Sequence, residues 1–336
     1  MKPAATLPFA GFGRDTGLDF VKGVLVVVMV LYHAMNYFAD APAAYYGYLR
    51  FVNGAFVFIT GYVVAVFRAD AALTGGHSPV APLALRGAKL LGLFTALNLA
   101  IGAGGVTNYK NVTFDIGGYF ERAGAVYLSG DAAQIAFRIL APISYVLMIS
   151  ALYLAAGRAQ AALIVTTLAA AAMYSLVLPI TPNGFFVLTG LVGLSLGLMQ
   201  RRFGRPHVHG VTALLAGLIL LAALMNTLSS NALAYALGIA VMMALLHDGA
   251  RRVAAHTRSY NALVLLGRYS LVGYIVQIGF LFLLHRSLHG RTLPPGAGLA
   301  LAFVATCAIV FAISHGLEAM RRRSGLVERT YRLVFA

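Results

Sequence analysis

One apolar stretch near the start of the chain, Phe20 to Phe38, carries ionisable side chains of kinds that could do chemistry. Lys22 and His33 are eleven residues apart. That step is three helical turns plus about 20°, so on an α-helix both side chains point the same way. The same face adds an acid, a carboxamide and a phenol, which are Asp19, Asn36 and Tyr37. The stretch therefore predicts one polar, ionisable face on an otherwise apolar helix.

These residue types have both a chemical and a structural reading. An ammonium group can hold phosphates, and an imidazole, which titrates near neutral pH, can act as a general base. Ionisable groups inside a membrane-spanning segment are costly, and they usually mark a functional site. The alternative is that His33 is a hydrogen-bonded packing residue and that Lys22 only extends its ammonium group to the membrane interface.

Two further groups of polar residues stand at the edges of apolar segments. Arg86 and Lys89 are one helical turn apart at the start of the third segment, where they could bind an anionic ligand or act as ordinary cytoplasmic anchors. Ser270, Tyr274 and Gln277 follow one another at i, i+4 and i+7 in the ninth segment. This stripe predicts either a cavity lining or hydrogen bonds between helices.

Composition indicates an integral membrane protein. Of the 336 residues, 60% are hydrophobic and only 10% are charged, whereas soluble domains carry about 25% charged residues. The net charge of +15 does not indicate nucleic-acid binding, because the basic residues flank apolar segments instead of forming a separate soluble domain. With one cysteine and no third ligand near His285 and His289, no metal site is expected.

The apolar segments predict an all-α fold of about ten transmembrane helices in a single domain covering residues 1–336. Placing 19 of the 25 Lys and Arg residues on the cytoplasmic side puts both termini in the cytoplasm. The long outer connection, Gly104 to Gln134, is expected to face the acceptor or to be a passive loop. The predicted spans are 20–38, 51–67, 85–103, 135–156, 161–178, 185–199, 211–228, 232–246, 269–284 and 297–313.

Four short motifs resemble those of the membrane acyltransferase family 3, especially its glucan-succinyltransferase-like branch. They are LDFVKG followed by a histidine in the first span, FVFITGY in the second, RGAK before the third and LGRYSLVGYIVQ in the ninth. The resemblance covers these motifs and the ten-span frame, and it does not extend over residues 104–260. It implies an enzyme of a bacterial inner (plasma) membrane that moves an acetyl or succinyl group from cytoplasmic acyl-CoA to a hydroxyl group outside, often on a polysaccharide.

The resemblance also implies roles for particular residues. The family's arginine and histidine fall on Lys22 and His33, and its second basic pair falls on Arg86 and Lys89. Lysine keeps the charge but loses the planar two-point grip on phosphate, so donor binding is expected to be weaker or differently arranged. At Gln277 the family has a histidine, and a carboxamide cannot carry its proton.

On this basis His33 is the expected general base. Asp19 is the second residue of the expected catalytic set, because it orients Lys22. Lys22, Arg86 and Lys89 bind the donor, and Lys22, ~16 Å from His33 along the helix, suits the phosphates. Asn36, Tyr37, Ser270, Tyr274 and Gln277 line the acceptor cavity. Acyl-CoA is a co-substrate, and no cofactor is permanently bound. The partners are a glycan or other hydroxyl acceptor and the bilayer, with no nucleic acid.

Two other functions fit the same sequence. A transporter or flippase for a polar lipid or small solute would place Lys22 and His33 along a translocation path. Against it, the sequence has no matching pair of Gly/Pro-broken helices. A structural or scaffold protein descended from the enzyme family is the second alternative. Binding of a CoA thioester favours the enzyme, and solute counterflow without such binding favours transport.

Overall fold

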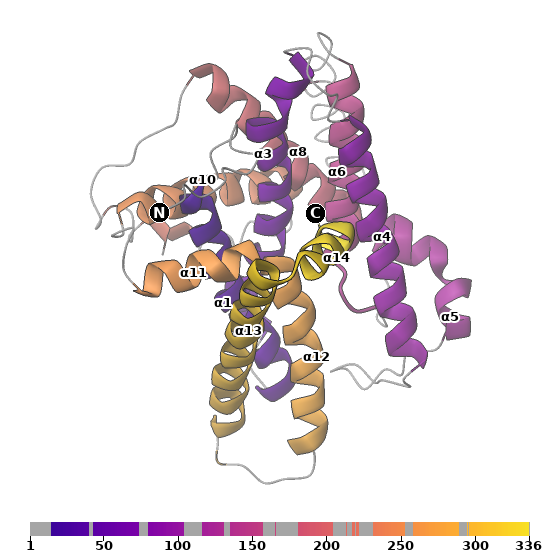
Figure 1. Ribbon diagram of the computed structural model, residues 1–336, viewed down its shortest axis with the longest axis vertical. Coiled ribbons are helices and arrows are strands. Elements are labelled where there is room, and N and C mark those ends of the chain that lie inside the picture. Colours follow the sequence, from indigo (N-terminus) through magenta and orange to yellow (C-terminus); the bar gives the residue numbers. More distant parts are fainter. Residues whose placement is uncertain are drawn as a thin grey trace.

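The computed structural model (Figure 1) describes residues 15–39, 43–73, 80–103, 116–130, 135–156, 181–203, 231–252, 258–288 and 296–335, and a few single positions elsewhere. Within these ranges all regular structure is helical. The helices are α1 (Thr16–Phe38), α2 (Ala43–Leu49), α3 (Phe51–Leu73), α4 (Val80–Ala103), α5 (Ile116–Glu121), the π-helix η1 (Ala125–Ser129), α6 (Leu140–Ala155), α8 (Pro182–Phe203), α10 (Ala232–Arg252), α11 (Arg258–Arg268), α12 (Ser270–Leu288), α13 (Ala297–Arg323) and α14 (Gly325–Phe335).

Seven helical stretches in the described part of the chain are long and apolar enough to cross a membrane. They are α1, α4, α8, α10, α12, α13 and the stretch Tyr45–Phe67, which contains most of α3. Helix α6 is also apolar but has only 16 residues. The prediction of an all-α, multi-pass membrane protein is thus confirmed, and eight of the ten expected spans have a matching helix. The expected spans 161–178 and 211–228 lie largely outside the described residues, so the count of ten stays a prediction.

The fourth span differs from the sequence-based expectation. It was expected to begin at residue 135, but α6 begins at Leu140 and residues 135–139 are not helical. Phe137 within this segment has a backbone φ of +53°, which a bulky L-residue rarely adopts and which ends any continuous helix there. We call residues 135–139 the strap. Helices α11 and α14, which were not expected as spans, are short amphipathic additions.

Contacts near the helix ends show the direction in which each helix runs. His247, late in α10, lies 3.1 Å from the carboxylate of Asp15 at the start of α1, so these two helices are antiparallel. The Tyr235 hydroxyl at the start of α10 donates a hydrogen bond to the Arg50 carbonyl just before α3 (2.9 Å), so α3 and α10 run the same way. These relative directions agree with the alternation that the ten-span prediction requires.

The last two long helices pack with α1 as a three-helix group, and Figure 1 shows α12 and α13 side by side. One layer of this group contains Val26 and Val310 with Val276 packed against them, and another contains Ala34, Leu281 and Ala302. Residue numbers therefore rise together along α1 and α12 and fall along α13. Helix α13 is antiparallel to the other two, as a short connection between α12 and α13 requires.

Helix α11 contacts the start of α1 at two glycines. A Cβ atom on Gly23 would overlap the Leu263 carbonyl oxygen, and one on Gly267 would overlap the Asp19 carbonyl oxygen. Such backbone-to-backbone approach is possible only without side chains, as at other small-residue helix contacts. The Phe20 and Tyr260 rings stack beside this contact with centroids 5.0 Å apart. The glycines thus hold α11 across α1 and set the position of the residues that follow in α12.

Candidate functional site

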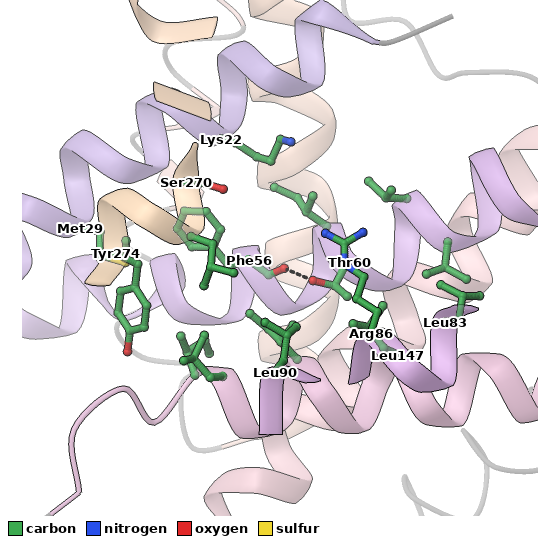
Figure 2. A pocket seen from close by; sticks show the side chains of 17 residues that line it. Lys22, Met29, Phe56, Thr60, Leu83, Arg86, Leu90, Leu147, Ser270 and Tyr274 are labelled. Carbon is green, nitrogen blue, oxygen red and sulfur yellow. Dashed lines mark hydrogen bonds between the residues drawn. The ribbon is translucent and has the colours of Figure 1, made fainter. Parts of the chain in front are cut away.

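A cavity of about 190 Å³ lies between α1, α3, α4, α6 and α12. Its walls are mostly apolar, and five polar side chains reach it from four different helices: Lys22, Thr60, Arg86, Ser270 and Tyr274. In Figure 2 the charged groups of Lys22 and Arg86 lie toward one edge of this cavity, and the ring of Tyr274 lies toward another. We call it the donor cavity, after the acyl donor that the sequence motifs lead us to expect, and it combines two cations from separate helices with an apolar interior.

The position of Lys22 follows from the first turns of α1. Asp15 caps the helix, because its carboxylate accepts a hydrogen bond from the Leu18 amide at 3.0 Å. Asp19, only 3% exposed, then pairs with the Lys22 ammonium group at 2.6 Å, which is the contact that the i, i+3 spacing predicts. The Gly267 contact fixes the same turn from outside. Lys22 is therefore held in one direction, toward the cavity.

Arg86 reaches the cavity from α4, which α6 holds closely. The Ser144 hydroxyl of α6 donates a hydrogen bond to the Gly87 carbonyl at 2.8 Å, and a Cβ on Gly87 would lie 2.6 Å from the Met148 side chain. Across the cavity, the Thr60 hydroxyl donates to the Phe56 carbonyl of its own helix at 2.9 Å, so its oxygen keeps a free lone pair (Figure 2). Arg86 is exposed, so it can meet a ligand at the mouth of the cavity.

His33 lies beyond the cavity, next to Tyr274. The His33 and Tyr274 ring centroids are 6.3 Å apart, and Tyr32 contacts the imidazole edge-on at 5.3 Å. The Nε2 atom of His33 is buried and has no hydrogen-bond partner among the described residues. A buried polar nitrogen without a partner costs free energy, and such a group usually has a ligand, a water or a chemical role to explain it.

The strap holds Tyr274 in place. The Asn98 carboxamide of α4, fully buried, accepts from the Ala136 amide at 2.9 Å and donates to the Ala136 carbonyl at 3.2 Å. The next residue, Phe137, packs edge-on against the Tyr274 ring with centroids 5.7 Å apart. A hydrogen bond also joins the Tyr274 hydroxyl to the Ile139 backbone. A strained, doubly clamped segment is thus part of the wall between the donor cavity and His33.

The residues predicted for the site are only partly brought together. Lys22, Arg86, Ser270 and Tyr274 line the donor cavity, and Asp19 touches it through Lys22. Five predicted residues are not part of its lining: His33, Asn36, Tyr37, Lys89 and Gln277.

Two of these five residues have well-defined surroundings elsewhere. Tyr37 packs against His285 near the far end of α12, with ring centroids 5.5 Å apart. Gln277 is fully buried, and neither atom of its amide has a hydrogen-bond partner among the described residues. Gln277 lies on α12 between the two buried layers in which α12 packs against α13. The three residues of the predicted polar stripe, Ser270, Tyr274 and Gln277, therefore do not all face one cavity.

Sequence reasoning missed Thr60, Asn98 and Phe137. The first two left a signal, because each is a polar residue inside an apolar helix, where polar groups normally meet protein or a cavity. Phe137 left none, since nothing in the local sequence announces a phenylalanine with positive φ. In the described part of the chain no group of three metal-ligating side chains occurs.

A second set of charges ties the helix α14 to α13. Glu328 accepts hydrogen bonds from Arg321 at 2.5 Å and from Arg332 at 2.6 Å. These bonds, the one from Arg321 first, lower the pKa of the Glu328 carboxyl group to about 2. Arg321 also donates to the hydroxyl of Tyr269, the residue just before Ser270. The network thus connects α14 to the start of α12.

No protein-family model, curated protein or solved structure matches this chain.

Proposed function

We propose that the protein is a membrane-embedded O-acyltransferase that moves an acetyl or succinyl group from cytoplasmic acyl-CoA to a hydroxyl group on the other side of the membrane. One observation carries this proposal. A cavity with two cations ends near the imidazole of His33, whose buried Nε2 has no partner among the described residues. The motifs that resemble the membrane acyltransferase family 3 lie on the same helices, and a glycan is the acceptor that this resemblance implies.

The donor would enter at the end that carries Lys22 and Arg86. A CoA thioester has phosphates at one end and a long, mostly uncharged arm that leads to the acyl group. The two cations suit the phosphates at the mouth, and the apolar walls suit the arm. Arg86 is exposed, so it supplies a cation that a phosphate can meet first at the mouth of the cavity.

The reaction would then take place between Tyr274 and His33. The Nε2 of His33 removes the proton of the acceptor hydroxyl while its oxygen attacks the thioester carbonyl. The carbon–sulfur bond breaks, and the CoA thiolate takes the proton from the imidazolium. General-base assistance of this kind contributes typically 10²- to 10⁴-fold to rate. Since the Tyr274 ring lies next to the imidazole, the thioester must displace it or pass its edge.

The test replaces His33 in the full chain, reconstituted in vesicles with an acceptor glycan and labelled acetyl-CoA or succinyl-CoA. We expect His33→Ala and His33→Gln to lower label transfer to the glycan at least about 100-fold, because neither side chain accepts a proton at neutral pH. Donor binding should be retained. His285→Gln is the matched control, since that imidazole packs against Tyr37 on the facing helix and should be dispensable. Near-normal transfer by a folded His33→Gln variant would refute the catalytic role.

A transporter or flippase is the second candidate, and the polar groups between α12 and α13 favour it. Gln277 and the Thr306 hydroxyl are both fully buried and have no partner in the described part of the chain. Buried polar groups of this kind can mark a path for a polar solute. Counterflow of a solute in vesicles without any CoA-thioester binding would support transport over acyl transfer.

A further inference from the structure

A second cavity, of about 280 Å³, lies on the other side of α1 and is bounded by α1, α3, α8 and α10. The two cavities share a wall: Lys22 lines the donor cavity and its neighbour Val21 lines this one, while Ile59 lines both. We call it the α10 cavity.

The polar groups of the α10 cavity are gathered at the last turns of α8 and α10. Gln200 accepts a hydrogen bond from the Tyr62 hydroxyl at 2.6 Å, so both side chains are occupied. His247 is paired with the Asp15 carboxylate at 3.1 Å. Apart from the charged residues Asp248 and Arg251, the remaining lining is aliphatic, aromatic or methionine. The cavity is therefore amphipathic, with a polar edge and an apolar interior.

One arginine at this edge has no ion pair among the described residues. Asp248 is already neutralised by Arg252, whose guanidinium lies 2.8 Å from its carboxylate. Arg251 lines the cavity, and no acidic partner of its side chain occurs among the described residues. The edge thus presents one cation without a counter-charge directly above apolar walls, which suits a carboxylate attached to a hydrocarbon chain.

We propose that the α10 cavity binds one medium-chain fatty acid, with the carboxylate on Arg251 and the chain between α1, α3 and α10. A cavity of roughly 150 Å³ holds one benzene ring, so a volume of about 280 Å³ admits a single chain of roughly ten carbon atoms and is too small for the two chains of a phospholipid. The bound chain would press on Val21 and Ile59, the wall that this cavity shares with the donor cavity. The site is independent of the proposed acyl transfer.

The experiment measures binding of radiolabelled decanoate to the purified full chain in detergent by equilibrium dialysis. We expect saturable binding of one decanoate per chain, weaker binding of hexanoate, and at least about tenfold weaker binding of decanol, which lacks the charge. Arg251→Gln should weaken decanoate binding by a similar factor. Arg258→Gln is the matched control, because Arg258 is also an exposed arginine but does not line the cavity, and it should bind decanoate normally.

A second pair of variants tests the apolar part of the site. Ala244→Phe fills the cavity from α10 and should abolish binding, whereas Val241→Phe, on an outward position that is 52% exposed, should not. Equal binding of decanol and decanoate, or equal loss in the two arginine variants, would overturn the proposal. So would full competition of decanoate by acetyl-CoA, since the cavity would then belong to the donor site. If Ala244→Phe does not elute as a folded protein, the arginine pair decides.

Discussion

Replacing Asn98 by leucine should release the strap and destabilise the fold. The Asn98 side chain is fully buried and makes two hydrogen bonds to the backbone of Ala136, at 2.9 and 3.2 Å, besides one to the Phe94 carbonyl of its own helix at 2.9 Å. Leucine fills a similar volume but can neither donate nor accept. The amide and the carbonyl of Ala136 would each lose a partner, at ~1–3 kcal/mol per group. Ala136 is partly exposed, so water can form some of the hydrogen bonds that its backbone loses.

Two such groups would cost about 2–6 kcal/mol together, and with water replacing part of the loss the free energy of unfolding of Asn98→Leu should fall by about 2–3 kcal/mol. Ser150→Ala is the matched control. Ser150 is also fully buried in an apolar helix, but its hydroxyl has no hydrogen-bond partner among the described residues. Removing an unpaired buried hydroxyl should leave stability unchanged or raise it slightly.

The assay is equilibrium unfolding of each purified variant in mixed micelles, followed by helical circular dichroism, with hydrogen exchange of residues 135–139 measured in parallel. Faster exchange at the strap should accompany the loss of stability, because the clamp on Ala136 is gone. If Asn98→Leu and Ser150→Ala unfold at the same free energy, the carboxamide does not hold the strap and the reasoning fails. A normal exchange rate at residues 135–139 would contradict it equally.

Three further predictions address the donor site, the C-terminal helix and the topology. Arg86→Ala should raise the KM for acyl-CoA more than the KM for the acceptor, and added salt should act in the same direction. Lys22→Arg should tighten donor binding. An unchanged KM for acyl-CoA in Arg86→Ala would leave Arg86 as a membrane anchor. The pKa of Glu328 is lowered to about 2, first by its hydrogen bond from Arg321. The stabilisation of α14 by this pair is thus present above the ordinary carboxyl pKa near 4.3, and it is lost as pH falls toward 2. We therefore expect the rate of proteolysis of α14 to be constant from pH 5 to 8 and to rise below pH 4. The variant Glu328→Gln should be cleaved faster at every pH. A reporter active only in the cytoplasm should be active at the C-terminus and silent after Asp115; the opposite result would reverse the proposed orientation.

Several features of this protein could be read from the sequence because they depend on neighbouring residues. Long apolar runs predict spanning helices whatever surrounds them, since backbone groups in a bilayer must be satisfied within the helix. The ion pair of Asp19 and Lys22 is equally local, because residues three apart on a helix are always neighbours. Ser270 and Tyr274, which are one helical turn apart on α12, both line the donor cavity, as their spacing predicts.

Other features depended on which segments meet. Helical spacing puts His33 on the face of Lys22, but the cavity stops at Tyr274, because the strap, from a segment about a hundred residues away, occupies the space beyond it. Gln277 continues the stripe of α12, yet α13 covers that part of the helix. Backbone geometry fixes the direction of side chains over a few turns, and it carries no information about the neighbour that each turn meets. Tertiary packing alone decided that Lys22 shares a cavity with Arg86, and that Arg251 stands at the edge of another.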